Sequence, residues 1–495
     1  MGGAAAERGI QARLPRVLGG DRAVILLCLL VWAPIVARTA LGLPVLPGRL
    51  GTDSEDYLTL AAHRPPLYGW LLAAYRWATG GLEHLPLFQL ALLAAGLLFF
   101  AVELGRMLRS AIAGAAAVLL ATRHLVVHDA PAAVMTEGLF LALLFAGLGL
   151  LFRHVRQGGG AAALVLASVC FALAAATRTT GTALLPLAPL LALLDHRLRP
   201  RAAILRAAWC AAAMAAVLAI AVAGNWARHG RAEIGSFAGI ALLGKALMLI
   251  GPADLPALPP AAASTVPVAE GARRRIESQP DLAARLRAHL QSSQDVRFGS
   301  FFPAAEAQWP AWRDASWRER SDLGLGVALR LVADHPLGFL RLWAQDWAAL
   351  LLYPGYRPAW ASADVGDPRA FPACGLQGNC WALTRYGVSP LWLGAMLVVS
   401  LGGAAVGLVV LLGAARPVLT RRAMPTTTLA WCLGLVLHAS LLLTSLAEAG
   451  FARYTAGLHV LGTALVLWAA VEVWRRGSLA ASRRAAPTHD LGGQG

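Results

Sequence analysis

Charged residues are scarce in this chain. Only 14% of its 495 residues are Asp, Glu, Lys or Arg, whereas 58% are hydrophobic, and the mean hydropathy is +0.59. This composition excludes a soluble protein of comparable size. Apolar runs of the length that a helix needs to cross a bilayer recur along the chain. We expect an all-α polytopic membrane protein with about ten spans, near residues 22–41, 86–104, 110–124, 136–152, 161–177, 180–195, 207–224, 389–413, 426–446 and 454–474.

Lysine is nearly absent. Lys245 is the single lysine among 43 basic residues, and the net charge is +16. The arginines gather in both tails and in short connections that alternate with the spans, so these segments share one side. The positive-inside rule makes that side cytoplasmic, and the charge therefore indicates membrane topology and contact with the lipid bilayer, not nucleic-acid binding. Together with the Ala- and Arg-rich usage, the pattern predicts a bacterial inner (plasma) membrane protein with both termini cytoplasmic.

Cysteine is also rare, and the sequence contains no C-x-x-C motif that would indicate a zinc site. Four of the six cysteines fall in predicted spans, where they serve as small apolar residues. Cys374 and Cys380 share an outer segment, and we expect a disulfide between them on an oxidising face. The first apolar run lacks a small-residue cleavage site after it and is expected to be a retained span.

The span pattern predicts the organisation of the chain. Residues 1–21 and 475–495 are cytoplasmic tails. The N-terminal bundle covers 22–224 and includes an outer loop at 42–85. An extracytoplasmic segment covers 225–388, and the last spans lie within 389–474.

Four helices are expected outside the spans. Amphipathic patterns predict interfacial helices at 65–78 and 334–353, and the extracytoplasmic segment shows further helical patterns at 268–292 and 315–334. The tryptophans of that segment, Trp309, Trp312 and Trp317, either anchor it at the membrane interface or stack on sugar rings, and interface anchoring is favoured.

The first outer loop contains the most informative stretch, DSEDYLTLAAHRPPLYGW at 53–70. A carboxylate at the membrane surface can take a proton from an acceptor beside a lipid-borne substrate. Asp53 and Asp56 are both candidates for this general base. The structural alternative for either acid is a helix cap or a solvated loop residue.

This loop resembles the first outer loop of polyprenyl-phosphate-dependent glycosyltransferases of the GT-C superfamily, in particular protein O-mannosyltransferases and lipid A aminoarabinose transferases. In that group the loop reads Asp-Glu-x-x-Tyr, followed by Lys-Pro-Pro-Leu and a Trp. The resemblance implies that Asp53 is the base and that Tyr57 is the family's tyrosine. Arg64 stands where the family has lysine before Pro-Pro. Ser54 replaces the family's second acid, so the choice between Asp53 and Asp56 stays open.

Three further positions carry the resemblance. Glu137 at the start of a span is similar to the family's glutamate, Arg178 lies in a Thr-Arg turn, and Arg453 with Tyr454 resembles an Arg-Tyr pair that opens the last span. The resemblance implies a lipid-linked sugar donor, a polyprenyl phosphate sugar, and an extracytoplasmic acceptor whose identity is unknown.

Several of these side chains suit substrate contacts. Arginine binds phosphate through forked hydrogen bonds, so Arg64, Arg178 and Arg453 are candidate phosphate ligands, with His63 as a further one. Each can instead contact lipid headgroups or form a local ion pair. Glu137 either orients the sugar or complements a helix dipole. Tyr454 is grouped with the substrate-binding residues.

A divalent metal, Mg or Mn, is a further expectation. Asp53 with His128 and Asp129 would supply its ligands.

The sequence therefore predicts a membrane glycosyltransferase, a hexosyl or pentosyl transferase, with a single inverting displacement at its extracytoplasmic face. The first alternative is a transporter or flippase of lipid-linked glycans. It is disfavoured because the chain shows no inverted repeat and its span centres carry few charges. The second alternative is a catalytically inactive scaffold member of the family.

Overall fold

A computed structural model of the whole chain describes residues 20–43, 53–124, 126–127, 130–235, 237–352, 390–447 and 452–485. These residues form helices and connecting turns, with no β-strand among them. Seven helices in this part of the chain are long and apolar enough to cross a membrane. They are α2 (Asp21–Leu41), α5 (Leu85–Met107), α8 (Glu137–Gln157), α11 (Pro200–His229), α21 (Pro390–Gly413), α23 (Pro425–Ala447) and α24 (Ala452–Ala485). The chain is thus an all-α, multi-pass membrane protein.

Three of the ten expected spans are shorter apolar helices. They are α6 (Ala111–Ala121), α9 (Ala161–Thr177), and the 3₁₀ helix η2 (Thr179–Leu184) continued by α10 (Leu187–Leu194). An 11-residue helix such as α6 is about 16 Å long, roughly half the thickness of a hydrocarbon core. Seven helices of the described residues thus have the length and composition of a membrane span, and the expected count of ten is not confirmed.

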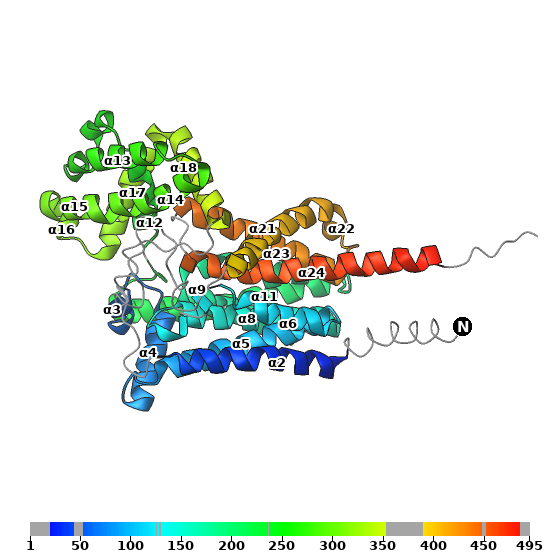
Figure 1. Cartoon of the computed structure of the whole chain (residues 1–495). Helices are drawn as coiled ribbons and strands as arrows, with labels where there is room; N and C mark the ends of the chain where they lie inside the picture. Colours follow the sequence, from blue (N-terminus) through cyan, green and yellow to red (C-terminus); the bar gives the residue numbers. More distant parts are fainter. Residues whose placement is uncertain are drawn as a thin grey trace, which may run out of the picture.

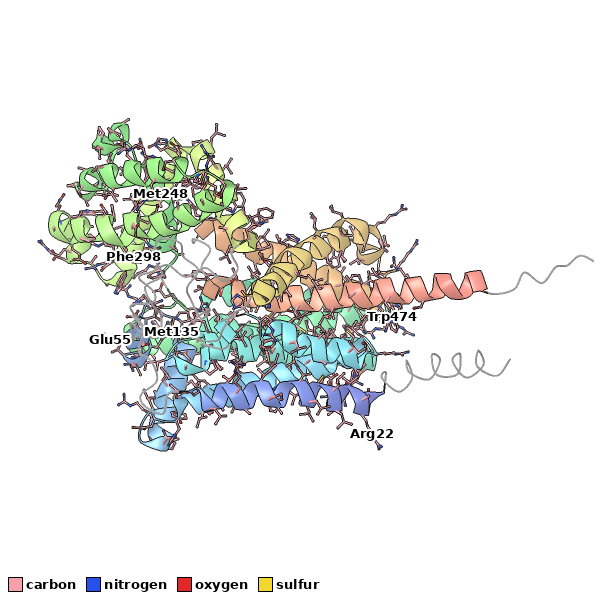
Figure 2. The ribbon with its side chains drawn as sticks, in the orientation of Figure 1. Arg22, Glu55, Met135, Met248, Phe298 and Trp474 are labelled. Carbon is pink, nitrogen blue, oxygen red and sulfur yellow. The ribbon has the colours of Figure 1, made fainter. Side chains whose placement is uncertain are left out.

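The long helices lie side by side in a bundle with two different ends (Figure 1). Helix α2 begins and α24 ends at one of them. The other is called the outer end below. It holds the short helices α3 (Ser54–Leu58) and α4 (Pro66–Thr79) and the helices of residues 238–352. Figure 2 marks these two ends by Arg22 and Trp474 on one side and by Glu55 and Met135 on the other.

Arginines tie the helices together at the end opposite the outer end. Arg156 on α8 pairs with Glu103 on α5 at 3.1 Å. Arg421, which follows α22 (Ala415–Leu419), donates to the carbonyl oxygen of Asp195 at 2.6 Å, beyond the end of α10. The arginine-rich connections thus meet at one end of the bundle, as their alternation with the apolar runs indicates.

A second group of helices follows α11 and has its own hydrophobic core. Trp312 is fully buried there and meets Phe301 edge to face, with ring centroids 5.7 Å apart. Interface anchoring, expected for Trp312, is therefore wrong, because its ring has no exposed surface. The group consists of α12 (Ala238–Ala246), η3 (Leu247–Leu249), η4 (Pro252–Ala257), α13 (Ala261–Glu277), α14 (Leu282–Gln294), η5 (Asp295–Phe301), α15 (Phe302–Gln308), α16 (Pro310–Arg313), α17 (Trp317–Asp334) and α18 (Pro336–Leu352).

Helix α18 forms a buried ion pair with α12, and the lysine of this pair also contacts the bundle. The chain bends by 109° between α17 and α18, so the two helices do not form one straight span. Asp346 of α18 lies 2.6 Å from Nζ of Lys245 on α12 and 2.8 Å from Nε2 of His289 on α14. Lys245 also donates to the carbonyl oxygen of Ser445 on α23. The sequence pattern predicts a polar stripe of α18 at the membrane interface, but Asp346 is only 1% exposed and faces the interior because its counter-charges are there.

Candidate functional site

The first outer loop is folded into two short helices that bring its charged residues together. Asp53 is the N-cap residue of α3, and Asp56 follows one helical turn later, so both carboxylates lie on the same side of the helix. Helix α4 starts at Pro66, where the missing N–H of proline leaves no hydrogen bond unsatisfied. Arg64 lies just before this start and returns toward α3.

Arg64 joins the two carboxylates. Its Nη2 lies 2.6 Å from Oδ1 of Asp53, and its Nε donates to Oδ2 of Asp56 at 2.9 Å. His63 Nε2 lies 3.1 Å from the same Oδ2 atom. We call Asp53, Asp56, His63 and Arg64 the acid cluster. It combines two carboxylates with one guanidinium that contacts both of them.

Asp56 is the more accessible of the two acids. Its side chain is 27% exposed, against 15% for Asp53. Among the described residues, every hydrogen bond and ion pair of the Asp56 carboxylate ends on Oδ2, which leaves Oδ1 open. Partial burial raises the pKa of Asp56, but the hydrogen bond from His63 and the charge of Arg64 outweigh this effect, and the pKa lies below its ordinary value. The carboxylate is therefore ionised at neutral pH.

Buried hydrogen bonds fix the acid cluster to the bundle. The Tyr57 ring packs edge to face on Tyr68, with centroids 5.3 Å apart, and Tyr68 donates to Oε1 of Gln89 at 2.8 Å. Gln89 on α5 in turn donates to the carbonyl oxygens of Pro131 and Ala133. Tyr57 was expected from the sequence, whereas Tyr68 and Gln89 were not. The available signal was a glutamine within an otherwise apolar helix.

A second cluster lies where α8, α9 and α24 meet at the outer end. Arg178, at the C-terminus of α9, forms an ion pair with Glu137 at the start of α8, and both side chains are at most 10% exposed. The guanidinium carbon lies 5.2 Å from the ring centroid of Tyr454. We call Glu137, Arg178 and Tyr454 the arginine cluster. The structure thus brings together three of the residues expected to bind substrate.

The phenol of Tyr68 is affected by residues of the loop and of the arginine cluster. Burial is the largest cause that raises its pKa well above the ordinary value, followed by the charge of Glu137 and by the neighbouring Tyr57.

Residues at the starts of α12 and α17 contribute two aromatic rings to the acid cluster. The Trp317 ring at the start of α17 lies 5.2 Å from the His63 ring with a tilt of 33°. The guanidinium carbon of Arg64 lies 5.3 Å from the Phe237 ring. Neither ring was expected at the loop, because Trp317 and Phe237 are both far from it in sequence.

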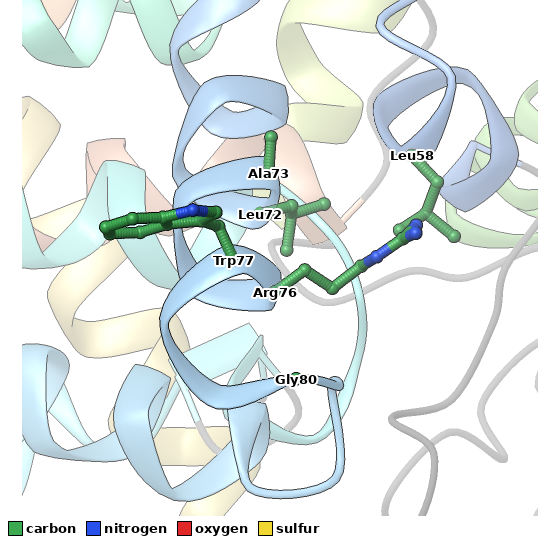
Figure 3. A pocket seen from close by; sticks show the side chains of 6 residues that line it. All are labelled: Leu58, Leu72, Ala73, Arg76, Trp77 and Gly80. Carbon is green, nitrogen blue, oxygen red and sulfur yellow. The ribbon is translucent and has the colours of Figure 1, made fainter.

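A cavity of about 440 Å³ lies between α3 and α4. Figure 3 shows Arg76 extending from α4 toward Leu58 of α3, while Trp77 lies on the other side of α4. The Trp77 side chain is 89% exposed. The cavity is lined by Leu58, Leu72, Ala73, Arg76, Trp77 and Gly80. Arg76 is the charged residue of this lining, and a guanidinium can bind an anionic group.

Other expected residues fall outside the described part of the chain. These are His128, Asp129, Cys374 and Cys380, together with the side chain of Arg453 on α24. The metal site and the disulfide therefore stay predictions. Within the residues that the structure describes, no three His, Cys, Asp or Glu side chains are grouped so that they could hold an ion.

Comparisons with known proteins give limited similarity. No family model and no curated protein matches the chain. Two solved structures of the oligosaccharyltransferase of Archaeoglobus fulgidus are similar at 14% identity. The first, tethered to an acceptor peptide with the NVT sequon, has a TM-score of 0.43 and is matched over 94% of this chain and 51% of that one. The second, named AglB and in complex with an inhibitory peptide and a dolichol-phosphate, has a TM-score of 0.40 and is matched over 96% of this chain and 52% of that one.

The chain thus spans about half the length of the solved structures it matches. Agreement at these TM-scores does not by itself establish a common fold.

Proposed function

We propose that this protein is an integral-membrane glycosyltransferase of the GT-C type. It moves a sugar from a polyprenyl-phosphate donor to an acceptor on the extracytoplasmic face, with inversion at the anomeric carbon. The observation that carries the proposal is the acid cluster at the outer end, where Arg64 holds Asp53 and Asp56 side by side. The loop that forms this cluster is also the one whose residues resemble the family.

The chemistry needs few groups. The acceptor gives its proton to a carboxylate and attacks the anomeric carbon. The bond between that carbon and the phosphate oxygen breaks, and its electron pair stays on the phosphate oxygen of the leaving polyprenyl phosphate. Polyprenyl phosphate is a good leaving group, so one ionised carboxylate is enough as general base. A single displacement inverts the anomeric configuration, whereas retention would require a second carboxylate acting as nucleophile.

We assign the role of general base to Asp56. Asp53 has the role of aligning Arg64. Asp56 is the more exposed acid and has an open oxygen, while His63 and Arg64 keep its other oxygen in place. The resemblance to the family favours Asp53 instead, so substitution of each acid decides between them. His63 belongs with Asp56 in this assignment and not with the donor phosphate.

The donor phosphate requires cations near the membrane surface. Arg178 is held by Glu137 and Tyr454, and Arg453 directly precedes Tyr454 on α24. Arg76 is a further candidate, because its guanidinium borders the cavity between α3 and α4. That cavity would take the first apolar units of the lipid, while the extracytoplasmic helices would contact the acceptor.

Transfer of label tests this proposal. The full-length protein is reconstituted in lipid vesicles with a panel of tritiated polyprenyl-phosphate hexoses and pentoses and with membrane extract as acceptor source. We expect release of free polyprenyl phosphate and an inverted anomeric configuration of the product by NMR. Label that crosses the bilayer while still attached to its lipid would support the flippase alternative and contradict the proposal.

A further inference from the structure

The N-terminus of α17 is built to hold one aromatic side chain at a fixed place. Ser316 caps the helix: its hydroxyl accepts from the N–H of Glu319, and the Glu319 carboxylate accepts from the N–H of Ser316 at 2.7 Å. Trp317 is the first residue of this capped helix. Because a capping box satisfies otherwise unpaired donors on both sides, the position of Trp317 is well defined.

Two contacts attach this helix start to the segment that leaves α11. Arg318 forms an ion pair with Glu233, and Arg231 donates to the Ser316 hydroxyl at 3.2 Å. Asn225 on α11 donates to the carbonyl oxygen of Glu233 at 2.9 Å. The capped start of α17 is therefore fixed to the membrane bundle.

The segment after α11 also runs along the first outer loop. A side chain at Gly235 would approach the backbone oxygen of His63 to 3.1 Å, which shows how closely the two segments pack. Trp317 is thereby brought over the imidazole of His63, and Phe237 lies 6.2 Å from Trp317 and 6.4 Å from His63.

His63 is 5% exposed although it belongs to an outer loop. Its Nε2 is directed at Asp56, and the Trp317 ring packs on the imidazole in a tilted arrangement. The two rings are tilted by 33° and their centroids are 5.2 Å apart, so the Trp317 ring limits the freedom of the imidazole to turn away from Asp56. The Trp317 side chain is itself 37% exposed, so it covers the histidine without being part of a closed core.

We propose that Trp317 is a positioning residue of the site, which holds His63 against Asp56 and makes the extracytoplasmic helices part of the catalytic centre. This inference rests on the proposed function. Trp317 acts through His63 alone, so its contribution exists only while His63 is present.

A double-mutant cycle measures this dependence. Trp317→Ala, His63→Ala and the double variant are compared with wild type by the rate of polyprenyl phosphate release. We expect Trp317→Ala to lower the rate by about 10- to 100-fold, the loss associated with a small misplacement of a reacting group. In the His63→Ala background the same change should have little further effect, and Trp317→Phe should recover most of the rate.

Trp309→Ala is the matched control, since Trp309 belongs to the same helical group but stacks on Trp312 and has no described ring contact with His63. We expect its release rate to stay close to wild type. Additive losses in the double variant, or an equal loss in Trp309→Ala, would overturn the proposal, because both would mean a general structural effect.

A chemical readout keeps the test independent of activity. Diethyl pyrocarbonate modifies accessible histidines, and peptide mass spectrometry reports the modification of His63. We expect slow modification in wild type and Trp309→Ala, and at least tenfold faster modification in Trp317→Ala. If no donor reacts but His63 is still uncovered by Trp317→Ala, the proposed function fails and the placement of Trp317 stands. Unchanged modification would contradict the placement itself.

Discussion

The hydroxyl of Ser54 donates a hydrogen bond of 2.8 Å to the carbonyl oxygen of Val134, 80 residues further along the chain. Ser54 is the first residue of α3 and is 1% exposed. A carboxylate in its place would lie against a carbonyl oxygen in a buried position, which is unfavourable. This contact gives a physical reason why the chain has serine here and carries its second acid at Asp56.

Replacing Ser54 should loosen the acid cluster. Ser54→Ala leaves the Val134 carbonyl without its partner, at a cost of about 1–3 kcal/mol, and the transfer rate should fall together with the melting temperature. Ser54→Glu should lower both the transfer rate and the melting temperature further than Ser54→Ala. Thr59→Ala is the control, because the exposed Thr59 hydroxyl bonds only within its own turn. Wild-type stability of Ser54→Ala in a thermal unfolding assay would contradict the role of this bond.

The pair Glu137–Arg178 should contribute strongly to stability. Glu137→Gln leaves a nearly buried guanidinium without its counter-charge, and we expect a loss of about 3–5 kcal/mol in the free energy of unfolding. Asp334→Asn, which breaks the far more exposed pair with Arg330, should cost less than about 1 kcal/mol. Chemical denaturation in detergent micelles compares the two. Equal losses would show that the Glu137–Arg178 pair is not buried in the folded protein.

The pH dependence of transfer follows from the lowered pKa of Asp56. The lowered pKa keeps the carboxylate ionised at every pH down to below about 3.9, the ordinary pKa of aspartate. The stabilising contacts with His63 and Arg64 are thus present above that value and are lost as the pH falls through the folded pKa. We expect a flat rate profile between about pH 8 and 5.

Replacing His63 should shift the fall of the transfer rate at low pH to a higher pH. Without the hydrogen bond and charge of His63, the effect of burial raises the pKa of Asp56. The transfer rate of His63→Ala should therefore begin to fall at a higher pH than that of wild type. Initial rates across the pH range measure the shift. If the rate fell at the same pH in both proteins, Asp56 would not control the rate.

The contact between Lys245 and Asp346 should fix α12 to α18. Lys245→Met leaves the buried Asp346 with only His289 as its described partner, and we expect a loss of about 3–5 kcal/mol. The double variant Lys245→Met with Asp346→Leu should recover much of this loss, since it removes both charges. The free energy of unfolding is measured for both variants. A double variant no more stable than the single one would contradict this account.

Much of the architecture could be predicted from the sequence, because membrane helices are encoded locally. Apolar runs such as 86–104 and 207–224 lie within α5 and α11, and the proline signal at Pro66 marks the start of α4. The number of spans could not be fixed in this way. A run such as 110–124 is apolar throughout, but its helix α6 ends at Ala121 and is short for a bilayer.

Individual site residues such as Asp53, Glu137 and Arg178 could be named from the sequence, but the contacts between them could not. Even in the loop from Asp53 to Arg64, where the residues are close in sequence, the ion pairs could not be read from spacing alone. The Glu137–Arg178 pair joins residues 41 positions apart. The contact of His63 with Trp317 depends on how α17 packs onto the loop, and this packing could not be read from one sequence.

Substitution of the two acids tests the central claim most directly. Asp53→Asn, Asp56→Asn and the neighbouring control Glu55→Gln are assayed for sugar transfer, and donor binding is measured in parallel by retention of labelled polyprenyl-phosphate sugar. We predict that Asp56→Asn loses transfer by about 10²- to 10⁴-fold while it still binds the donor. Asp53→Asn should lose less, and Glu55→Gln, whose side chain is exposed, should remain active. Full activity of Asp56→Asn would contradict its role as the base, and full activity of both aspartate variants would remove the acid cluster from the reaction.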